Sequence, residues 1–379
     1  MRVSDPSTSI LDVPRARGEH VDISVLVPVL NEERHIRETV AAMQAQRFDG
    51  TIELLYADGV SEDRTREILL ELAQRDPRIR VLENPRRGTA SALNVCLREA
   101  RGEFVARMDA HTYYGDRYLA AGVERLGRGD TDWVSGPAVP KPTGLVSRAV
   151  ALALASWLGR GGSRKWDEEA ESTGERELDT GVFGGVWRRS TVVEIGGWDE
   201  RWPINQDSEM ASRFHARGAR LVCLPEMIGR YVPRNSLRKL GRQYFRYGFY
   251  RARTFRRHPQ SMRRSHLIAP VLAASLPATV AGTRSVRFVA RTCVGAYLIA
   301  VLVTGASTAI RTRRPAEGAM LAAVLPTMHL GWGFGTLVGM ARFGPPVAAF
   351  ARVLGLSDGG AAAHEPGPVY APSLYGVQA

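Results

Sequence analysis

The sequence predicts an α/β protein with a mostly parallel sheet, followed by a basic helix and by apolar helices near the C-terminus. Apolar strand-like segments alternate with helical ones between residues 23 and 108, which is typical of a parallel sheet with helices on both faces. Residues 230–264 hold many arginines and no Asp or Glu, and long apolar runs follow. At 379 residues, 44% hydrophobic and 24% charged, the chain is long enough for a catalytic-size domain with an appendage.

The N-terminal half supplies strands and helices in turn. The expected strands are Ile23–Pro28, Ile52–Asp58, Ile79–Leu82 and Glu103–Met108. The expected helices open at Asn31, with Ile36, Val40 and Met43 on one face, and run over Thr65–Gln74 and Gly88–Ala100. Ligands of open parallel sheets bind at the carboxyl ends of the strands. Asp58 and Asp109 are placed at two such ends, so we expect both at one ligand-binding edge.

Asp109 and His111 follow the fourth strand, two residues apart. In an extended segment such residues point to the same side, and a carboxylate and an imidazole are ordinary ligands of divalent metals. The pair could therefore hold one cation. In the alternative interpretation Asp109 caps a turn, where Asp is common, and His111 is a solvated loop residue.

The middle of the chain contains a second candidate acid. Leu178–Gly185 is a flexible glycine-rich turn, and a helix is expected over Met210–Arg217. Asp207 would lie in the first turn of that helix, where the helix dipole favours a negative charge. From this segment alone Asp207 is either such a helix-terminal carboxylate, with no chemistry, or a catalytic group.

The segment Leu237–Phe255 has apolar and aromatic residues at helical spacing, with arginines on an adjoining stripe. Cationic amphipathic helices bind anionic membrane surfaces, and no nucleic-acid motif accompanies this one. Thr292–Ile310 and Ala319–Ala341 are each near the ~20 residues that cross a bilayer. Leu267–Gly282 is shorter and holds two prolines. Because the two longer runs contain no charges, membrane spans are favoured over buried helices of a soluble domain.

Several classes of protein are excluded or disfavoured. No G-x-G-x-x-G follows the first strand and no Walker A sequence is present, which disfavours dinucleotide and P-loop enzymes. The three cysteines imply no disulfide framework. The expected organisation is a disordered tail (1–20), a catalytic domain (21–232), a basic interfacial region (233–264), a membrane region of two to three helices (265–345) and a flexible tail (346–379).

Eight motifs in order resemble those of family 2 glycosyltransferases, which have the GT-A fold. They are Val27–Glu33, Ala57–Asp63, Arg87–Asn94, Arg107–His111, Phe183–Arg189, Gly196–Glu200, Asn205–Glu209 and Gln243–Tyr247. The D-x-H triplet at Asp109, together with Tyr231–Arg234 and the apolar C-terminal region, is similar to the succinoglycan-type glucosyltransferase subgroup.

The sequence departs from the family pattern at several positions. His111 stands at the third position of the usual D-x-D, Gln206 stands where Glu is frequent, and Tyr247 replaces the Trp of Q-x-x-R-W. The Asp58 segment has one Asp where many relatives have two.

The resemblance implies transfer of a sugar from a nucleoside diphosphate donor to an acceptor hydroxyl, with inversion at the anomeric carbon. It implies Asp207 as the catalytic base. Donor-binding residues would be Pro28, Glu32, Asp58, Arg87 and Asp109; the acceptor and diphosphate side would be Gln243, Arg246 and Tyr247; the metal ligands would be Asp109 and His111, holding Mg²⁺ or Mn²⁺.

The expected partners are a nucleotide-sugar donor, a lipid-linked glycan acceptor and membrane lipids, with no nucleic acid. The expected location is the inner (plasma) membrane, crossed more than once, with the catalytic domain in the cytoplasm, where nucleotide sugars are. UDP-glucose as donor follows only from the subgroup resemblance. A polyprenyl-phosphate sugar transferase and a non-catalytic membrane protein that binds nucleotide sugar or lipid are the alternatives; a binding protein would have no need of a base.

Overall fold

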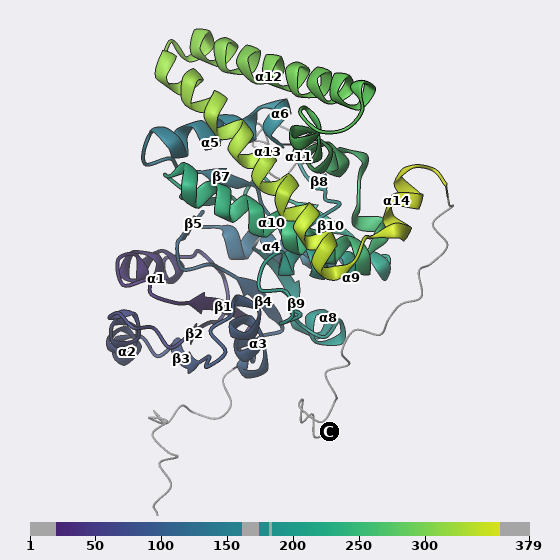
Figure 1. The fold of residues 1–379 in the computed structure, drawn as a ribbon. Helices are drawn as coiled ribbons and strands as arrows, with labels where there is room; N and C mark the ends of the chain where they lie inside the picture. The colour runs from purple at the N-terminus through teal and green to yellow at the C-terminus, as the bar shows by residue number, and fades with distance from the viewer. Residues whose placement is uncertain (1–19, 161–173, 182–183, 357–379) are drawn as a thin grey trace, which may run out of the picture.

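The computed structural model describes residues 20–160, 174–181 and 184–356 (Figure 1). Within these residues the main sheet has eight strands in the order β3-β2-β1-β4-β9-β6-β10-β8. The strands are β3 (Ile79–Glu83), β2 (Ile52–Asp58), β1 (Ile23–Val29), β4 (Phe104–Arg107), β9 (Gly185–Arg188), β6 (Trp133–Ser135), β10 (Leu221–Cys223) and β8 (Arg176–Glu177). The first four pair in parallel, whereas β9 is antiparallel to β4 and to β6. The α/β class and the four expected strands are confirmed.

Helices cover both faces of this sheet, and successive side chains of its strands point alternately into the two cores that lie between sheet and helices. In β1, Val25 and Val27 face one core together with α1 (Ile36–Gln44), α2 (Thr65–Arg75) and α4 (Tyr118–Leu126). Leu26 faces a second core with α3 (Thr89–Glu99), α8 (Arg189–Glu194) and α9 (Gln206–Ala216). Side chains that alternate along a strand point to opposite faces, so a strand of continuous apolar residues is buried on both sides.

A smaller sheet lies beside the main one in the order β5-β11-β7. It consists of β5 (Thr112–Tyr114), β11 (Gly229–Tyr231) and β7 (Ala138–Pro140). β5 begins five residues after the end of β4, so the chain turns between the two sheets at 108–111. The expected metal-binding pair lies in this turn.

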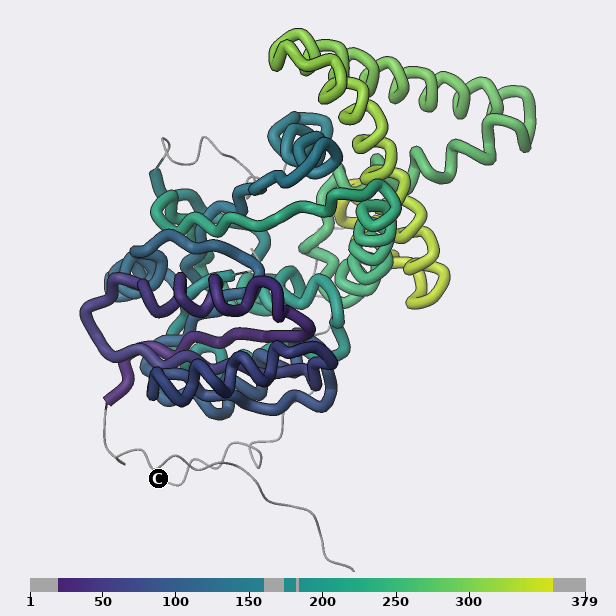
Figure 2. Tube along the Cα trace, turned by 90° about the vertical axis from the view of Figure 1, so that its left-hand side faces the viewer, coloured from purple at the N-terminus to yellow at the C-terminus, as the bar shows by residue number. Residues whose placement is uncertain are grey.

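The C-terminal helices project from one side of the α/β layers (Figure 2). They are α10 (Leu237–Arg257), α11 (Ile268–Ala278), α12 (Arg284–Thr312), α13 (Pro315–Phe343) and α14 (Val347–Val353), preceded in the chain by α5 (Leu145–Ala155) and α6 (Trp157–Arg160). Of the helices that the structure describes, α12 and α13 are long and apolar enough to cross a membrane.

Helix α13 packs against helices of the catalytic part along much of its length. Near its start it shares an apolar core with α5, including Leu321 and Val150. Further along, it lies so close to α10 that a methyl group at Gly335 would come within 2.0 Å of the Phe245 carbonyl oxygen. A methyl group at Gly339 would come within 2.4 Å of the Phe249 carbonyl oxygen. Small residues allow this backbone approach, as at helix interfaces in membranes.

The prediction of a flexible tail from residue 346 onward is wrong for residues 347–353. Helix α14 lies there, with Ala349 and Val353 buried in a small core with Phe255 and Met262. Arg352 also donates to the carbonyl oxygens of Pro259 and Gln260 at 3.3 and 3.2 Å. The predictions made for residues 1–19 and 357–379 concern residues that the structure does not describe.

Candidate active site

Three loops meet at the carboxyl edge of β1, β2 and β4. Val29 is in register with Asp58 and Leu26 with Arg107, so these strands end side by side. The loops after β1 and β2 are tied together: the Asn31 amide N–H donates to Ser61 Oγ at 2.9 Å, and the Glu62 amide N–H donates to Asn31 Oδ1 at 2.8 Å. This is the edge at which a ligand was expected.

Arg107 joins the two acids that the sequence singled out. Its Nε and Nη2 donate to the two carboxylate oxygens of Asp109 at 2.8 and 3.1 Å, and its Nη1 donates to Asp207 Oδ1 at 2.5 Å. The side chain of Arg107 is only 4% exposed. Burial lowers the pKa of this guanidinium, but the two carboxylates outweigh burial and raise the pKa above its ordinary value. Arg107 is therefore a fixed cation between the end of β4 and the first turn of α9.

His111 lies in the turn between β4 and β5 and not in an extended strand. The expectation that Asp109 and His111 share an extended segment is therefore wrong, because the chain leaves the main sheet after Arg107 and turns at residues 110–111. His111 Nδ1 instead lies 3.1 Å from Glu32 Oε1 in the loop after β1. This hydrogen bond, with the charge of Asp109 adding to it, raises the pKa of the His111 imidazole.

The other expected donor-side residues lie around the same edge. Asp58 is buried at the end of β2, where its carboxylate accepts from Ser61 Oγ at 2.6 Å and from the Ser61 amide N–H at 3.2 Å. Arg87 has a left-handed backbone (φ 58°) just before α3 and pairs with Glu62 at 3.0 Å. Pro28 lies within β1, one residue before its end.

Helix α10 carries the residues that are expected on the acceptor side. Gln243 Nε2 donates to Tyr247 Oη at 2.8 Å, one helical turn apart. Burial raises the pKa of the Tyr247 hydroxyl, and the charge of Asp207 adds to this rise. The charges of Arg234 and Arg246 act in the opposite direction and lower the pKa. The Asn205 side chain donates to the Tyr247 carbonyl oxygen at 2.9 Å. Asn205 is the residue before α9, so the start of the helix that carries Asp207 is attached directly to α10.

A buried ionic cluster holds the far side of α9 against the end of α10. Glu209, with no exposed side-chain surface, pairs with Arg213 at 2.8 Å and lies 3.2 Å from His258 Nε2. Burial raises the pKa of Glu209, but His258 and Arg213 outweigh burial and keep the pKa below its usual range. Arg257 bridges to Asp199 at 2.7 Å. This cluster fixes the orientation of the helix that presents Asp207.

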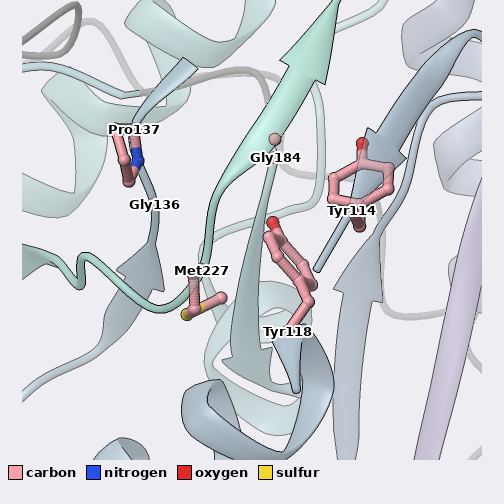
Figure 3. Close-up of a pocket in the computed structure, with 7 residues that line it drawn as sticks. Tyr114, Tyr118, Gly136, Pro137, Gly184 and Met227 are labelled. Carbon is pink, nitrogen blue, oxygen red and sulfur yellow. The ribbon is translucent and has the colours of Figure 1, made fainter. Parts of the chain in front are cut away.

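Two tyrosines, Tyr118 buried and Tyr114 partly buried, form the floor beneath Asp109. The Asp109 amide N–H donates to Tyr114 Oη at 2.7 Å, and the Tyr114 and Tyr118 rings meet edge to face with centroids 4.6 Å apart. Figure 3 shows Tyr118 between Tyr114 and Met227, with its hydroxyl toward Gly184. The cavity between them is about 10 Å³, room for about one water molecule. A cavity of this size is too small for a substrate. The two tyrosines around it support the Asp109 loop from below.

The donor set expected for a divalent cation is the Asp109 carboxylate and the His111 imidazole. Among the described residues no group of three or more His, Cys, Asp or Glu is placed to hold a metal. Both oxygens of Asp109 already accept from Arg107, and each keeps a second lone pair. The residues therefore fit a cation that takes most of its ligands from phosphate oxygens and water, as Mg²⁺ commonly does.

Sequence reasoning missed Arg107 and Asn205 as parts of the site. Arg107 is the single charged residue of the segment 104–108, and a charge inside an apolar strand indicates a buried partner. Asn205 has a left-handed backbone (φ 65°), which Asn tolerates better than most residues. The sequence holds no signal for its bond to α10, which joins residues far apart in the chain.

The comparisons with known proteins agree on one family. The family described as Glycosyl transferase family 2 matches residues 24–184. The succinoglycan biosynthesis protein ExoA of Rhizobium meliloti (strain 1021) is 30% identical over 320 residues, which is 82% of this chain and 92% of ExoA.

Two further relatives are more distant. Dolichyl N-acetyl-alpha-D-glucosaminyl phosphate 3-beta-D-2,3-diacetamido-2,3-dideoxy-beta-D-glucuronosyltransferase of Methanococcus voltae is 25% identical over 234 residues, 60% of this chain and 71% of the relative. The structure of mannosyltransferase PcManGT from Pyrobaculum calidifontis, in complex with GDP-Man and Mn²⁺, superposes with a TM-score of 0.50 at 22% identity. That match covers 84% of this chain and 90% of PcManGT.

Proposed function

Because the chain belongs to glycosyl transferase family 2 and has its GT-A fold, we propose that it is an inverting transferase that moves a hexose from a nucleoside diphosphate sugar to a glycan acceptor. The proposed donor is UDP-glucose, and the proposed acceptor is a lipid-linked glycan or a polysaccharide under assembly. ExoA, by its name, acts in succinoglycan biosynthesis. The name of the Methanococcus voltae relative describes a dolichyl phosphate sugar.

The observation that carries this proposal is the contact of one buried guanidinium with both Asp109 and Asp207. The donor-side loop after β4 and the first turn of α9 are thereby held within the length of one side chain. A donor sugar beside Asp109 and an acceptor hydroxyl beside Asp207 would be close enough to react. The same contact gives both carboxylates a fixed orientation before either substrate binds.

In the proposed reaction the acceptor oxygen attacks the anomeric carbon from the Asp207 side. Asp207 takes the hydroxyl proton, the new carbon–oxygen bond forms, and the bond to the diphosphate breaks with its electron pair on the leaving oxygen. This single displacement inverts the anomeric carbon. General-base assistance of this kind contributes about 10²–10⁴ in rate.

The leaving diphosphate needs positive charge. Asp109 and His111 would hold a Mg²⁺ or Mn²⁺, which would supply that charge when bound; Arg246 on α10 is proposed to add to it. PcManGT, with its Mn²⁺, supports a divalent cation in this fold. Pro28, Glu32, Asp58 and Arg87 are proposed to bind the base, ribose and phosphates of the donor. Gln243 and Tyr247 are proposed to contact the acceptor.

We also propose that α10 to α13 bind the enzyme to the inner membrane, with residues 21–232 as the cytoplasmic catalytic domain, 233–264 at the membrane surface and 265–345 embedded. Helix α12 supports this proposal because many of its large apolar side chains are exposed, for instance Phe288 at 71% and Leu302 at 64%. So many exposed large apolar side chains on one helix are unusual for the surface of a soluble protein.

The direct test uses the full chain in membranes with a panel of nucleotide sugars, with and without added Mg²⁺ or Mn²⁺. We expect metal-dependent release of one nucleoside diphosphate, stimulated by acceptor, and loss of that release in EDTA. No consumption of any donor would favour the non-catalytic alternative. Transfer to polyprenyl phosphate itself would favour the alternative transferase.

Asp207→Asn tests the base. We expect kcat to fall by about 10²-fold or more, with the KM for the donor little changed, because the amide keeps the shape of the side chain but does not accept the proton. Asp116→Asn is the matched control, since that exposed carboxylate pairs, among the residues that the structure describes, with Arg47 alone. Near-normal turnover by Asp207→Asn would require a different base.

A further inference from the structure

A second cavity lies at the other end of the C-terminal helices, between α5 and the turn that joins α12 to α13. Its volume is about 480 Å³. Figures 1 and 2 both show that turn beside α5. The lining residues are Gly144, Leu145, Arg148, Arg313, Arg314, Pro315, Ala316 and Glu317.

The lining is strongly cationic. It holds three arginines and one acid, so two positive charges remain after Glu317 is counted against one of them. Glu317 is 5% exposed, and its Oε1 accepts from Arg148 at 3.2 Å and from Arg314 at 3.0 Å. The third arginine, Arg313, has a left-handed backbone (φ 55°). It is exposed, and within the described residues its side chain makes no hydrogen bond or ion pair.

Two helices also begin at this cavity. The first turns of α5 and α13 both line it, and the N-terminal ends of helices attract anions. Arginine adds a planar fork of N–H donors that suits phosphate oxygens. An anion in the cavity would therefore meet the arginines and the positive ends of two helices together.

Exposed apolar side chains accompany the cationic lining, one on α5 within the lining and one on α12 close to Arg313 in the chain. Leu145 lines the cavity and is 42% exposed, and Ile310, one turn before Arg313 on α12, is 78% exposed. A free phosphate would make no contact with these apolar side chains, whereas the acyl chains of a phospholipid would contact them.

We propose that this cavity binds the phosphate of an anionic phospholipid, with Arg313 as the side chain that contacts the headgroup directly. Arg148 and Arg314, held by Glu317, line the cavity behind it. The lipid would fasten the α12–α13 turn to α5 and so to the catalytic domain. This site is separate from the donor and acceptor residues and does not depend on the transfer reaction.

The test measures lipid binding by the detergent-solubilised full chain, and the melting temperature of the protein reports the binding. Dioleoylphosphatidylglycerol, dioleoylphosphatidylcholine and inorganic phosphate are titrated in parallel. We expect a saturable rise in melting temperature with phosphatidylglycerol alone. Arg313→Gln should weaken its apparent affinity about tenfold, the size of one charge-assisted contact, and Arg313→Lys should retain most of it.

Arg311→Gln is the matched control, since Arg311 is an exposed arginine of the last turn of α12 that does not line the cavity. Equal responses to phosphatidylglycerol and phosphatidylcholine would overturn the proposal, as would an equal response to inorganic phosphate. The same loss in Arg311→Gln and Arg313→Gln would also overturn it, because the effect would then be general surface charge.

Discussion

Arg107 enters the site from the last position of β4, and its guanidinium lies almost fully buried between Asp109 and Asp207. Taking one partner out of such a buried arrangement leaves unpaired charge, which is more costly than the pairing itself is favourable. The residue therefore has two consequences, one for the stability of the site and one for its geometry.

We expect Arg107→Met to destabilise the protein by about 3–5 kcal/mol, seen as a lower melting temperature in detergent, and to abolish transfer. Adding Asp109→Asn should recover part of the stability, because one of the uncompensated carboxylates is then neutral. Strict additivity of the two changes would argue against their coupling. Arg117→Met, which removes an exposed pair with Glu124, is the control and should cost under about 1 kcal/mol.

At the residue scale the sequence singled out Asp109 and Asp207 but did not predict the geometry that joins them. Asp109 and Asp207 were expected at one cleft, and the structure brings them to one guanidinium. The turn at His111 could not be read from its neighbours, because Thr112 pairs with Tyr231 of β11, far along the chain. Local spacing describes a strand well, but it does not show where the strand leaves its sheet.

Among the elements, the contact between α10 and α13 determines how the residues proposed to contact the acceptor are supported. Gln243 and Tyr247 lie on α10, and α13 lies behind that helix with Gly335 against the Phe245 carbonyl. The alternating strands and helices of residues 23–107 were predictable because their pattern is local. The α10–α13 contact was not, since each helix on its own reads only as basic or apolar.

Gly335→Ala should therefore separate the two helices. We expect a loss of about 1–3 kcal/mol, typical of overpacking, together with lower kcat for transfer. Gly295→Ala in α12 is the matched control, because a methyl group there would meet nothing within 4 Å. If both variants behave alike, the close approach of α10 and α13 has no influence on catalysis.

For the whole molecule, the two long apolar helices differ in position: α13 is the inner helix and α12 is the outer one. Helix α13 is covered by α5 and α10, whereas α12 leaves Phe288, Leu298 and Ile299 exposed. The outer surface of α12 is thus the surface proposed to meet lipid. The predicted membrane region gave the helices but not this division, which depends on packing between distant segments.

Cys293 is a natural probe of that surface, since it is exposed on α12 while Cys96 and Cys223 are buried. In native membranes we expect a membrane-impermeant maleimide to leave Cys293 unlabelled until detergent is added. Glu124→Cys, at a position 65% exposed on α4, should be labelled at once in inside-out vesicles. Immediate labelling of Cys293 in intact membranes of both orientations would place α12 in water.

The packing of α13 on α10 also has a consequence for the order in which the protein is synthesised. The ribosome completes α10, with its acceptor residues, well before it reaches Gly335 and Gly339. Until then α10 is attached to α9 but lacks its contact with α13, so the residues proposed to contact the acceptor are supported on one side only. We expect transfer activity to appear only after α13 has been inserted. Incomplete chains would then not consume nucleotide sugar.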